Sequence, residues 1–135
     1  MLQRDYFIRL IEEFQAALRK FLEKVEDDRK DAELKDLYRQ YVGSYEVLRN
    51  LSIEEIMTYA AAEWSDAERM ERLGFLAELL YAEGCYKVNP LRDLLLGKAY
   101  RLFDYLDGHS GTMSLDRMQK MAQIRRMAPE SVSVD

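Results

Sequence analysis

The chain has 135 residues, of which 48% are hydrophobic and 33% are charged. This composition is too apolar for a disordered chain, and charges interrupt every apolar stretch before the roughly 20 residues that a membrane-spanning helix needs. The length fits one domain, which can bury about two thirds of the surface that the unfolded chain exposes. The net charge of −5 argues against general affinity for nucleic acid or anionic lipid. We therefore expect one soluble globular domain that binds neither nucleic acid nor a membrane.

The single cysteine, Cys85, excludes an intramolecular disulfide and a cysteine-based zinc site. The N-terminus lacks the basic segment and apolar run of a secretory signal. Both features favour a cytoplasmic protein. The acidity is concentrated in residues 51–86, which carry two arginines and eight acidic residues.

Residues 4–26 predict a long amphipathic helix. Eight apolar residues recur there at steps of one, three or four, which gathers them on about a third of the helix surface. They are Phe7, Leu10, Ile11, Phe14, Leu18, Phe21, Leu22 and Val25. The mixed-charge run 23–31 predicts a turn, with Asp28 or Asp31 as the cap of the next helix. Because the apolar stripe needs a partner surface, we expect this helix to be part of the core.

A second apolar stripe runs from Leu34 to Leu48, with Gly43 on its opposite side. A glycine inside a helix costs about 1 kcal/mol, so this stretch can form one helix with a weak centre. Alternatively, Gly43 ends one helix and Ser44 begins another. We favour the single helix.

Two capping boxes follow this stripe. In the first, Ser52 covers the amide of Glu55 and Glu55 reaches back, which starts a short helix that ends near Glu63. The second box, from Ser65 to Glu68, starts a new helix at residue 66.

The next two helices are the predicted centre of the core. The first is apolar nearly all round in its second half and ends at Gly84, which suits a left-handed C-cap. The second follows Asn89-Pro90, a cap and a proline for the first helical turn, and ends at Gly108. We expect the two to form an antiparallel hairpin.

The end of the chain predicts one more helix. Residues 107–112 form a loop by composition, Ser114 caps a helix that ends near Met127, and Pro129 follows. Every strong periodicity is close to 3.6 residues, so the predicted fold class is all-α, with five to six helices packed as antiparallel hairpins. The single domain spans residues 1–128, and 129–135 form a flexible tail.

Few residues have catalytic potential. His109 is the only histidine, and Leu106 stands where a di-metal site of the Glu-x-x-His type needs glutamate. The Gly-His-Ser-Gly run at 108–111 is followed by Thr112, so it does not match a nucleophile elbow. Cys85 has no histidine placed by the sequence to activate it. We expect no catalytic residue, no metal and no cofactor, and hence no enzyme.

Two sets of residues are candidates for binding. The last helix has a basic side and several methionines, which suit a surface that contacts the acidic 51–86 segment of a second chain. This interaction surface comprises Arg117, Lys120, Met121, Arg125, Arg126, Tyr81 and Tyr86. The second set is aromatic and either packs in the core or lines a ligand pocket. Its members are Tyr38, Tyr41, Tyr45, Tyr59 and Trp64.

The hairpin over residues 70–107 resembles a tetratricopeptide unit. In that motif the first helix ends in Gly-x-Tyr, which Gly84-Cys85-Tyr86 matches. The second helix carries an alanine, an aromatic residue four positions later and an apolar residue three after that, which match Ala99, Phe103 and Leu106. About ten extra residues separate the halves, and the tryptophan and final proline of the repeat have no counterpart.

Taken whole, the chain resembles an uncharacterised family of small bacterial proteins. Members share a Gln-x-Asp-Tyr-like start, a Leu-Ser-x-Glu-like box, a tetratricopeptide-like hairpin and a final helix with serine, arginine and lysine at fixed spacing. The matching residues are Gln3, Asp5, Tyr6, Arg9, Ile11, Glu12, Glu13, Leu51, Ser52, Glu55, Leu79, Leu80, Tyr81, Glu83, Gly84, Ser114, Leu115, Arg117 and Lys120. The resemblance implies an all-helical fold and brings no known activity.

These features predict a non-enzymatic protein–protein interaction or scaffolding module. Its expected partner is another protein, with a homodimer as one form. The alternative is a small-ligand-binding or regulatory domain with an aromatic-lined pocket. The direction of the aromatic side chains distinguishes the two, because a dry packed core favours the first and a cavity with converging polar groups favours the second.

Overall fold

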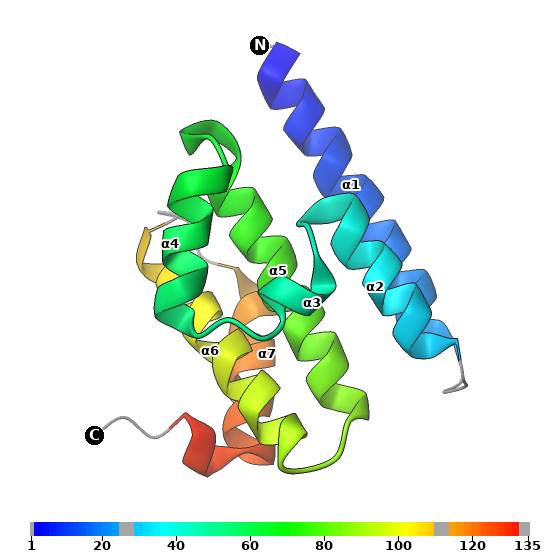
Figure 1. The fold of residues 1–135 in the computed structure, drawn as a ribbon, viewed down its shortest axis with the longest axis vertical. Coiled ribbons are helices and arrows are strands. Elements are labelled where there is room, and N and C mark those ends of the chain that lie inside the picture. Colours follow the sequence, from blue (N-terminus) through cyan, green and yellow to red (C-terminus); the bar gives the residue numbers. More distant parts are fainter. Residues whose placement is uncertain (1, 25–28, 110–113, 133–135) are drawn as a thin grey trace.

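The computed structural model describes residues 2–24, 29–109 and 114–132. In these ranges the chain forms seven α-helices, one short 3-10 helix and no strand (Figure 1). The elements are α1 (Leu2–Glu23), α2 (Lys30–Tyr41), α3 (Tyr45–Leu48), α4 (Ile53–Glu63), α5 (Asp66–Tyr86), α6 (Leu91–His109), α7 (Leu115–Met127) and η1 (Pro129–Ser131). The all-α class is confirmed, and the expected count of five to six helices was too low.

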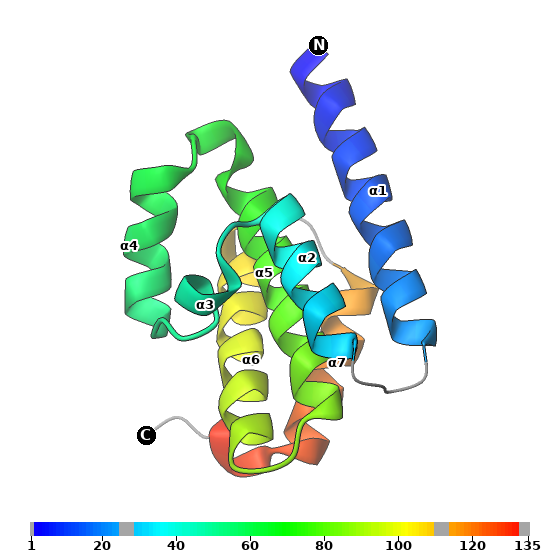
Figure 2. The same ribbon diagram turned by 45° about the vertical axis from the view of Figure 1, so that its right-hand side comes forward.

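Helix α5 lies at the centre of the fold. It packs along α6 and also contacts α1, α2 and α4, while α6 is covered by α7 and η1. Figures 1 and 2 show α5 and α6 running in opposite directions, with α1 and α2 on one side of α5 and α4 on another. The predicted antiparallel hairpin is therefore present. No helix in the described part of the chain is long and apolar enough to cross a membrane.

The core consists of the second half of α5, the inner side of α6 and one side of each surrounding helix. Each fully buried leucine or phenylalanine contributes about 1.5–3 kcal/mol to the stability of the fold. The hydrophobic residues of α5 and α6 that are at most 1% exposed are Leu73, Leu76, Ala77, Leu79, Leu80, Leu95, Leu96, Ala99, Leu102 and Phe103.

The expected C-cap at Gly84 is wrong. This glycine lies inside α5, which continues to Tyr86. A Cβ atom on Gly84 would lie 2.7 Å from Cδ2 of Leu96, so the glycine permits the close approach of α5 and α6. Gly108 likewise does not end its helix, because α6 includes His109.

The favoured single helix across Gly43 is also wrong. Helix α2 ends at Tyr41, and Gly43 adopts φ +146°, a conformation that other residues rarely adopt. Ser44 then caps α3, its Oγ accepting a hydrogen bond of 3.4 Å from the amide of Val47. The glycine breaks the helix because its backbone conformation reverses the direction of the chain toward α3.

The predicted capping box is present at the start of α4 but not at the start of α5. Ser52 and Glu55 form the predicted capping box. Ser65 precedes α5 as predicted, but its hydroxyl donates to the carboxylate of Glu68 at 3.1 Å and caps no amide. The guanidinium of Arg69 reaches across this turn and donates to the carbonyls of Ala60 in α4 and of Trp64, the residue that follows α4.

The ends of α1, α2 and the chain differ from expectation by a few residues. Helix α1 ends at Glu23, and α2 is preceded by Arg29, so Asp31 lies inside α2 and is not its cap. Ser114 caps α7 as predicted. The expected flexible tail begins instead with η1, where Ser131 packs against Gly97. Residues 25–28, 110–113 and 133–135, and with them Val25, Asp28, Thr112 and Met113, lie outside the described residues.

Candidate interaction site

Helix α1 presents apolar side chains in two rows, and the first row is packed in the core. The ring of Phe14 stacks on Phe75 of α5, with 4.3 Å between the centroids, and meets the edge of Tyr41 at 5.1 Å. The hydroxyl of Tyr41 donates to the carboxylate of Glu13 at 2.9 Å, and burial together with this bond raises the pKa of Tyr41 to about 12. The row comprises Leu10, Phe14, Ala17 and Phe21.

The second row lies beside the first and is only partly covered. Its members recur at alternating steps of three and four residues, the spacing of helices that pack side by side. The central Leu18 is buried, but Ile8 is 46% exposed and Leu22 is 51% exposed. The row comprises Ile8, Ile11, Gln15, Leu18 and Leu22. The eight-residue stripe predicted from the sequence omitted Ile8, although its spacing to Ile11 was the signal that could have found it.

Four residues of the second row form one wall of a groove of about 560 Å³: Ile11, Gln15, Leu18 and Leu22. The floor is apolar and includes Phe75 of α5 together with Phe103 and Leu106 of α6. Gly74 lies in this floor, and a Cβ atom there would make an ordinary van der Waals contact with Leu106 Cδ1 at 3.9 Å. The opposite wall is the first half of α7, and in Figure 2 the N-terminal end of α1 extends beyond the other helices.

Ion pairs within the chain lie along the groove. Lys120 of α7 contacts Glu78 of α5 and also lies 2.8 Å from Asp116. Burial raises the pKa of Glu78 against the opposing charge of Lys120. Burial also disfavours the charge of Lys120, but Glu78 and Asp116 outweigh it and raise the lysine pKa. Helix α7 is thus held to α5 by charges of its own chain.

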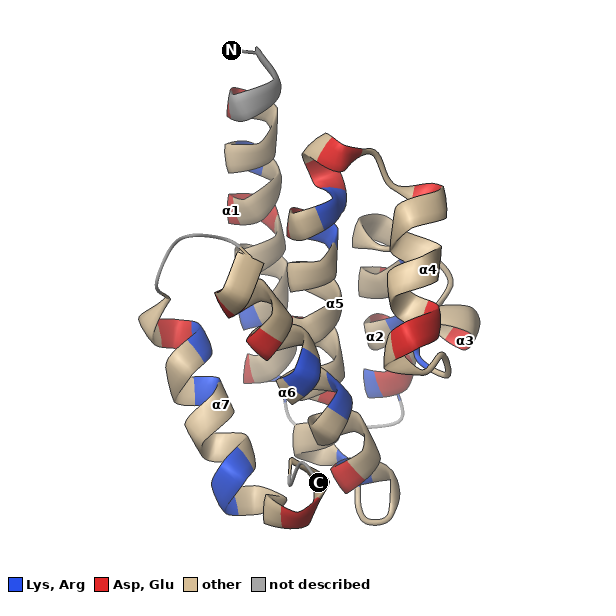
Figure 3. Ribbon diagram, turned by 90° about the vertical axis from the view of Figure 1, so that its left-hand side faces the viewer, with Lys and Arg blue, Asp and Glu red and all other residues tan. Residues whose placement is uncertain are grey.

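The basic residues of α7 (Figure 3) were expected to contact the acidic segment of a second chain, but several of them pair within their own chain instead. Arg117 lies 2.7 Å from Asp107. Arg125 donates to the hydroxyl of Tyr100 at 2.8 Å. Arg126 is exposed and donates to Gln123, while Met121 is only 7% exposed.

The two tyrosines predicted for the same surface also have partners inside the chain. Tyr81 is half-buried and meets the ring of Phe103 at 6.3 Å. Tyr86 donates to Asp31 at 2.6 Å and lies beside the ring of Phe21. The seven residues of the predicted surface therefore do not form one uncovered patch.

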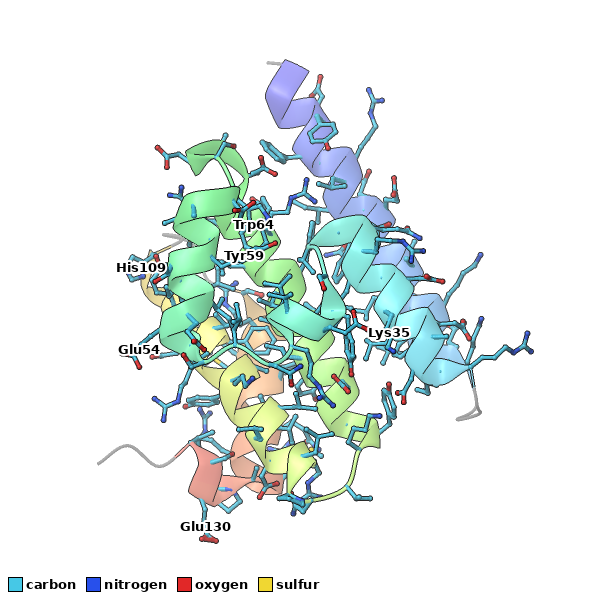
Figure 4. All side chains as sticks on the ribbon, in the orientation of Figure 1. Lys35, Glu54, Tyr59, Trp64, His109 and Glu130 are labelled. Atoms are coloured by element: carbon cyan, nitrogen blue, oxygen red, sulfur yellow. The ribbon has the colours of Figure 1, made fainter. Side chains whose placement is uncertain are left out.

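The five aromatic residues predicted to line a pocket pack as two pairs and one core residue. Tyr38 is fully buried and meets Tyr45 edge-on at 5.0 Å. Tyr59 and Trp64 lie together at the end of α4, 5.5 Å apart (Figure 4). Tyr41 belongs to the cluster around the first row of α1. None of the five lines the groove.

A buried polar cluster that the sequence did not predict fixes α3 against α5. The carboxylate of Glu83 is completely buried and accepts hydrogen bonds from Tyr45 at 2.7 Å and from Arg49 at 3.0 Å. Lys98 of α6 donates to the carbonyls of Arg49 and Leu51. The charges and hydrogen-bond groups of the cluster are used within the fold, so we assign it a structural role.

The remaining chemically reactive residues are not gathered into a site. His109 stacks on Tyr105, with 4.0 Å between the rings, and its Nδ1 lies 2.8 Å from the Tyr105 carbonyl. In Figure 4 this histidine lies on the outside of the molecule. Burial raises the pKa of the Cys85 thiol, which disfavours the thiolate. The described residues contain no group of three or more histidine, cysteine or acidic side chains that could hold a metal ion.

No protein-family model matches this chain, and comparison with curated proteins and with solved structures finds no significant match. The resemblance to the uncharacterised bacterial family therefore stays a prediction.

Proposed function

We propose that this protein is a non-catalytic protein–protein interaction module that holds an amphipathic helix in the groove between α1 and α7. The observation that carries the proposal is the second row of α1. Four of its five residues line an apolar-floored groove, Ile8 lies one turn beyond it, and the two ends of the row, Ile8 and Leu22, are about half exposed. An incompletely covered apolar row beside a groove is the arrangement in which helix-binding proteins seat a partner helix.

The length of the second row of α1 favours a helix over a small molecule as the partner that covers it. The groove volume of about 560 Å³ lies within the range of small-ligand pockets. However, the row extends from Ile8 to Leu22, about 21 Å along the helix axis at 1.5 Å per residue. A small molecule in the groove leaves Ile8 uncovered, whereas a helix laid along α1 covers both ends.

The proposal places the protein in the cytoplasm and treats the α5–α6 pair as a tetratricopeptide-like hairpin. Support for the second point comes from Ala99, Phe103 and Leu106, which are all buried on α6. Further support comes from Gly84, whose missing side chain permits the close approach of the two helices. Such hairpins commonly serve as binding scaffolds.

A pair of variants tests the proposed function. Leu22→Asp places a charge in the groove wall, whereas Leu94→Asp places one on α6 at a leucine of similar exposure, 58%, that does not line the groove. In a pull-down from the source cell, Leu22→Asp should lose groove-dependent proteins, a second copy included, while Leu94→Asp retains them. Circular dichroism should show the same helicity for both. Equal retention by the two variants contradicts the proposal.

A further inference from the structure

Two charged residues border the second row of α1 and have no polar partner among the residues that the structure describes. Glu12 and Arg19 are seven residues apart, so they lie on the same flank of the helix, one near each half of the row. Both are exposed, and neither forms an ion pair or hydrogen bond within the described part of the chain. Most other charged residues near the groove, including Glu78, Asp116 and Lys120, are already paired.

We infer that the helix held by the groove is α1 of a second copy of this chain, packed antiparallel along the second row. This inference rests on the proposed function and names its partner. In an antiparallel pair, Glu12 of each chain lies beside Arg19 of the other. The dimer therefore forms two ion pairs between the chains. The same arrangement sets Ile11 of one chain beside Leu22 of the other, which covers apolar surface that the single chain leaves exposed.

Glu12 and Arg19 also favour the antiparallel orientation of the two α1 helices. A parallel pair places the two copies of Glu12 on opposite sides of the helix–helix contact, and likewise the two copies of Arg19, so it forms neither of the attractive contacts between Glu12 and Arg19. The antiparallel pair has two-fold symmetry, so both chains use the same surface and both grooves are filled.

The primary test is the mass of the full chain in sedimentation equilibrium at micromolar concentration. The wild-type protein should have twice the 15.9 kDa of one chain. Glu12→Arg and Arg19→Glu each replace two attractive contacts with two repulsive ones, so each should weaken the dimer about tenfold. The double variant Glu12→Arg/Arg19→Glu restores opposite charges and should return the dissociation constant to within about threefold of the wild-type value.

Disulfide trapping tests the orientation in a Cys85→Ser background. A chain with Ile11→Cys mixed with a chain with Leu22→Cys should form a mixed disulfide dimer under mild oxidation. Each chain alone should form far less, because only a parallel pair brings two copies of residue 11 or two copies of residue 22 together. Dominant self-linked dimers overturn the antiparallel arrangement.

Other outcomes separate this inference from the proposed function. A wild-type chain that remains monomeric at tens of micromolar overturns the dimer. If Leu22→Asp then still loses proteins from the pull-down, the groove function stands with a different partner. A dimer that neither Leu22→Asp nor the charge variants weaken also overturns the inference, because it must use another surface. Matching circular dichroism spectra and melting temperatures confirm that the charge variants remain folded.

Discussion

The two apolar rows of α1 share one helix and a similar composition, yet they have different surroundings. The first row is enclosed by α2 and α5, and Phe14 is only 2% exposed. The second row faces a groove, and both its ends are about half exposed. The difference shows that apolar periodicity predicts which residues avoid water and leaves open whether the same chain or another one covers them.

The largest expected difference between the two rows comes from placing a carboxylate in each. Phe14→Asp buries an unpaired charge and removes the stacked ring, which should cost more than about 4 kcal/mol and unfold the protein. Ile8→Asp places the same charge at a half-exposed end and should change the free energy of unfolding by less than about 1 kcal/mol. Urea denaturation of both variants at one low protein concentration checks this. A folded Phe14→Asp protein means that the first row is not part of the core.

Removing the cation of a buried ion pair should also destabilise the protein more than removing the cation of an exposed pair. Arg49→Met leaves the fully buried carboxylate of Glu83 without its guanidinium, which should cost about 3 kcal/mol. Arg39→Met removes an exposed partner of Asp36 on α2 and should cost less than about 0.5 kcal/mol. Thermal melting of the two variants measures the contrast, and equal melting temperatures refute the structural role of the buried cluster.

Replacing two glycines of α5 with alanine compares the enclosed α5–α6 contact with the groove floor, because each substitution adds a single methyl group. Gly84→Ala forces the new Cβ against Leu96 in the closed α5–α6 contact and should destabilise the protein by about 1–3 kcal/mol. Gly74→Ala adds the same atom at the groove floor, where there is room, and should stabilise the protein by about 0.5–1 kcal/mol through helix propensity. Opposite signs in chemical denaturation are expected, and a stabilising Gly84→Ala contradicts the close approach of the two helices.

The last prediction concerns the pH dependence of stability that comes from Asp31, a residue that links α2 to the end of α5. Hydrogen bonds from Tyr86 and Lys87 lower the pKa of this carboxyl from its ordinary value of 3.8. Because the pKa is lowered, the ionised Asp31 carboxylate stabilises the folded protein above pH 3.8. This stabilisation is lost as the pH falls through the folded-state pKa. Because the side chain is about half exposed, Asp31→Asn should cost less than about 1 kcal/mol at pH 7. Its melting temperature should converge with that of the wild type below pH 3.8, and a constant difference down to pH 2 argues against the linkage.

Local signals in the sequence predicted the elements best where one residue decides the backbone. Ser52 with Glu55 and Ser114 mark the helix starts that the structure has, because a cap satisfies amides only a few residues away. Glycine was harder to interpret. Gly43 breaks a helix that we expected to continue, and Gly84 lies inside a helix that we expected to end, because the same residue serves a positive φ or a close contact.

The candidate site was predicted less well than the fold. The basic residues of α7 were expected to contact the acidic segment of a second chain, whereas Lys120 meets Glu78 of that segment in its own chain and Arg117 pairs with Asp107 outside the segment. The second row of α1 was present in the sequence at steps of three and four residues. Without knowing where α2 and α7 lie, the sequence could not show that this row borders a groove.

By itself, the sequence determined that the chain is helical and which positions along each helix avoid water, since both follow from periodicity and capping within a few residues. Only the tertiary structure decided which apolar row is enclosed, which charges find partners and where a groove remains. Those features depend on contacts between residues far apart in the chain, such as Arg49 with Glu83 and Phe14 with Phe75. Local patterns do not encode such distances, because burial is a property of the packed helices together.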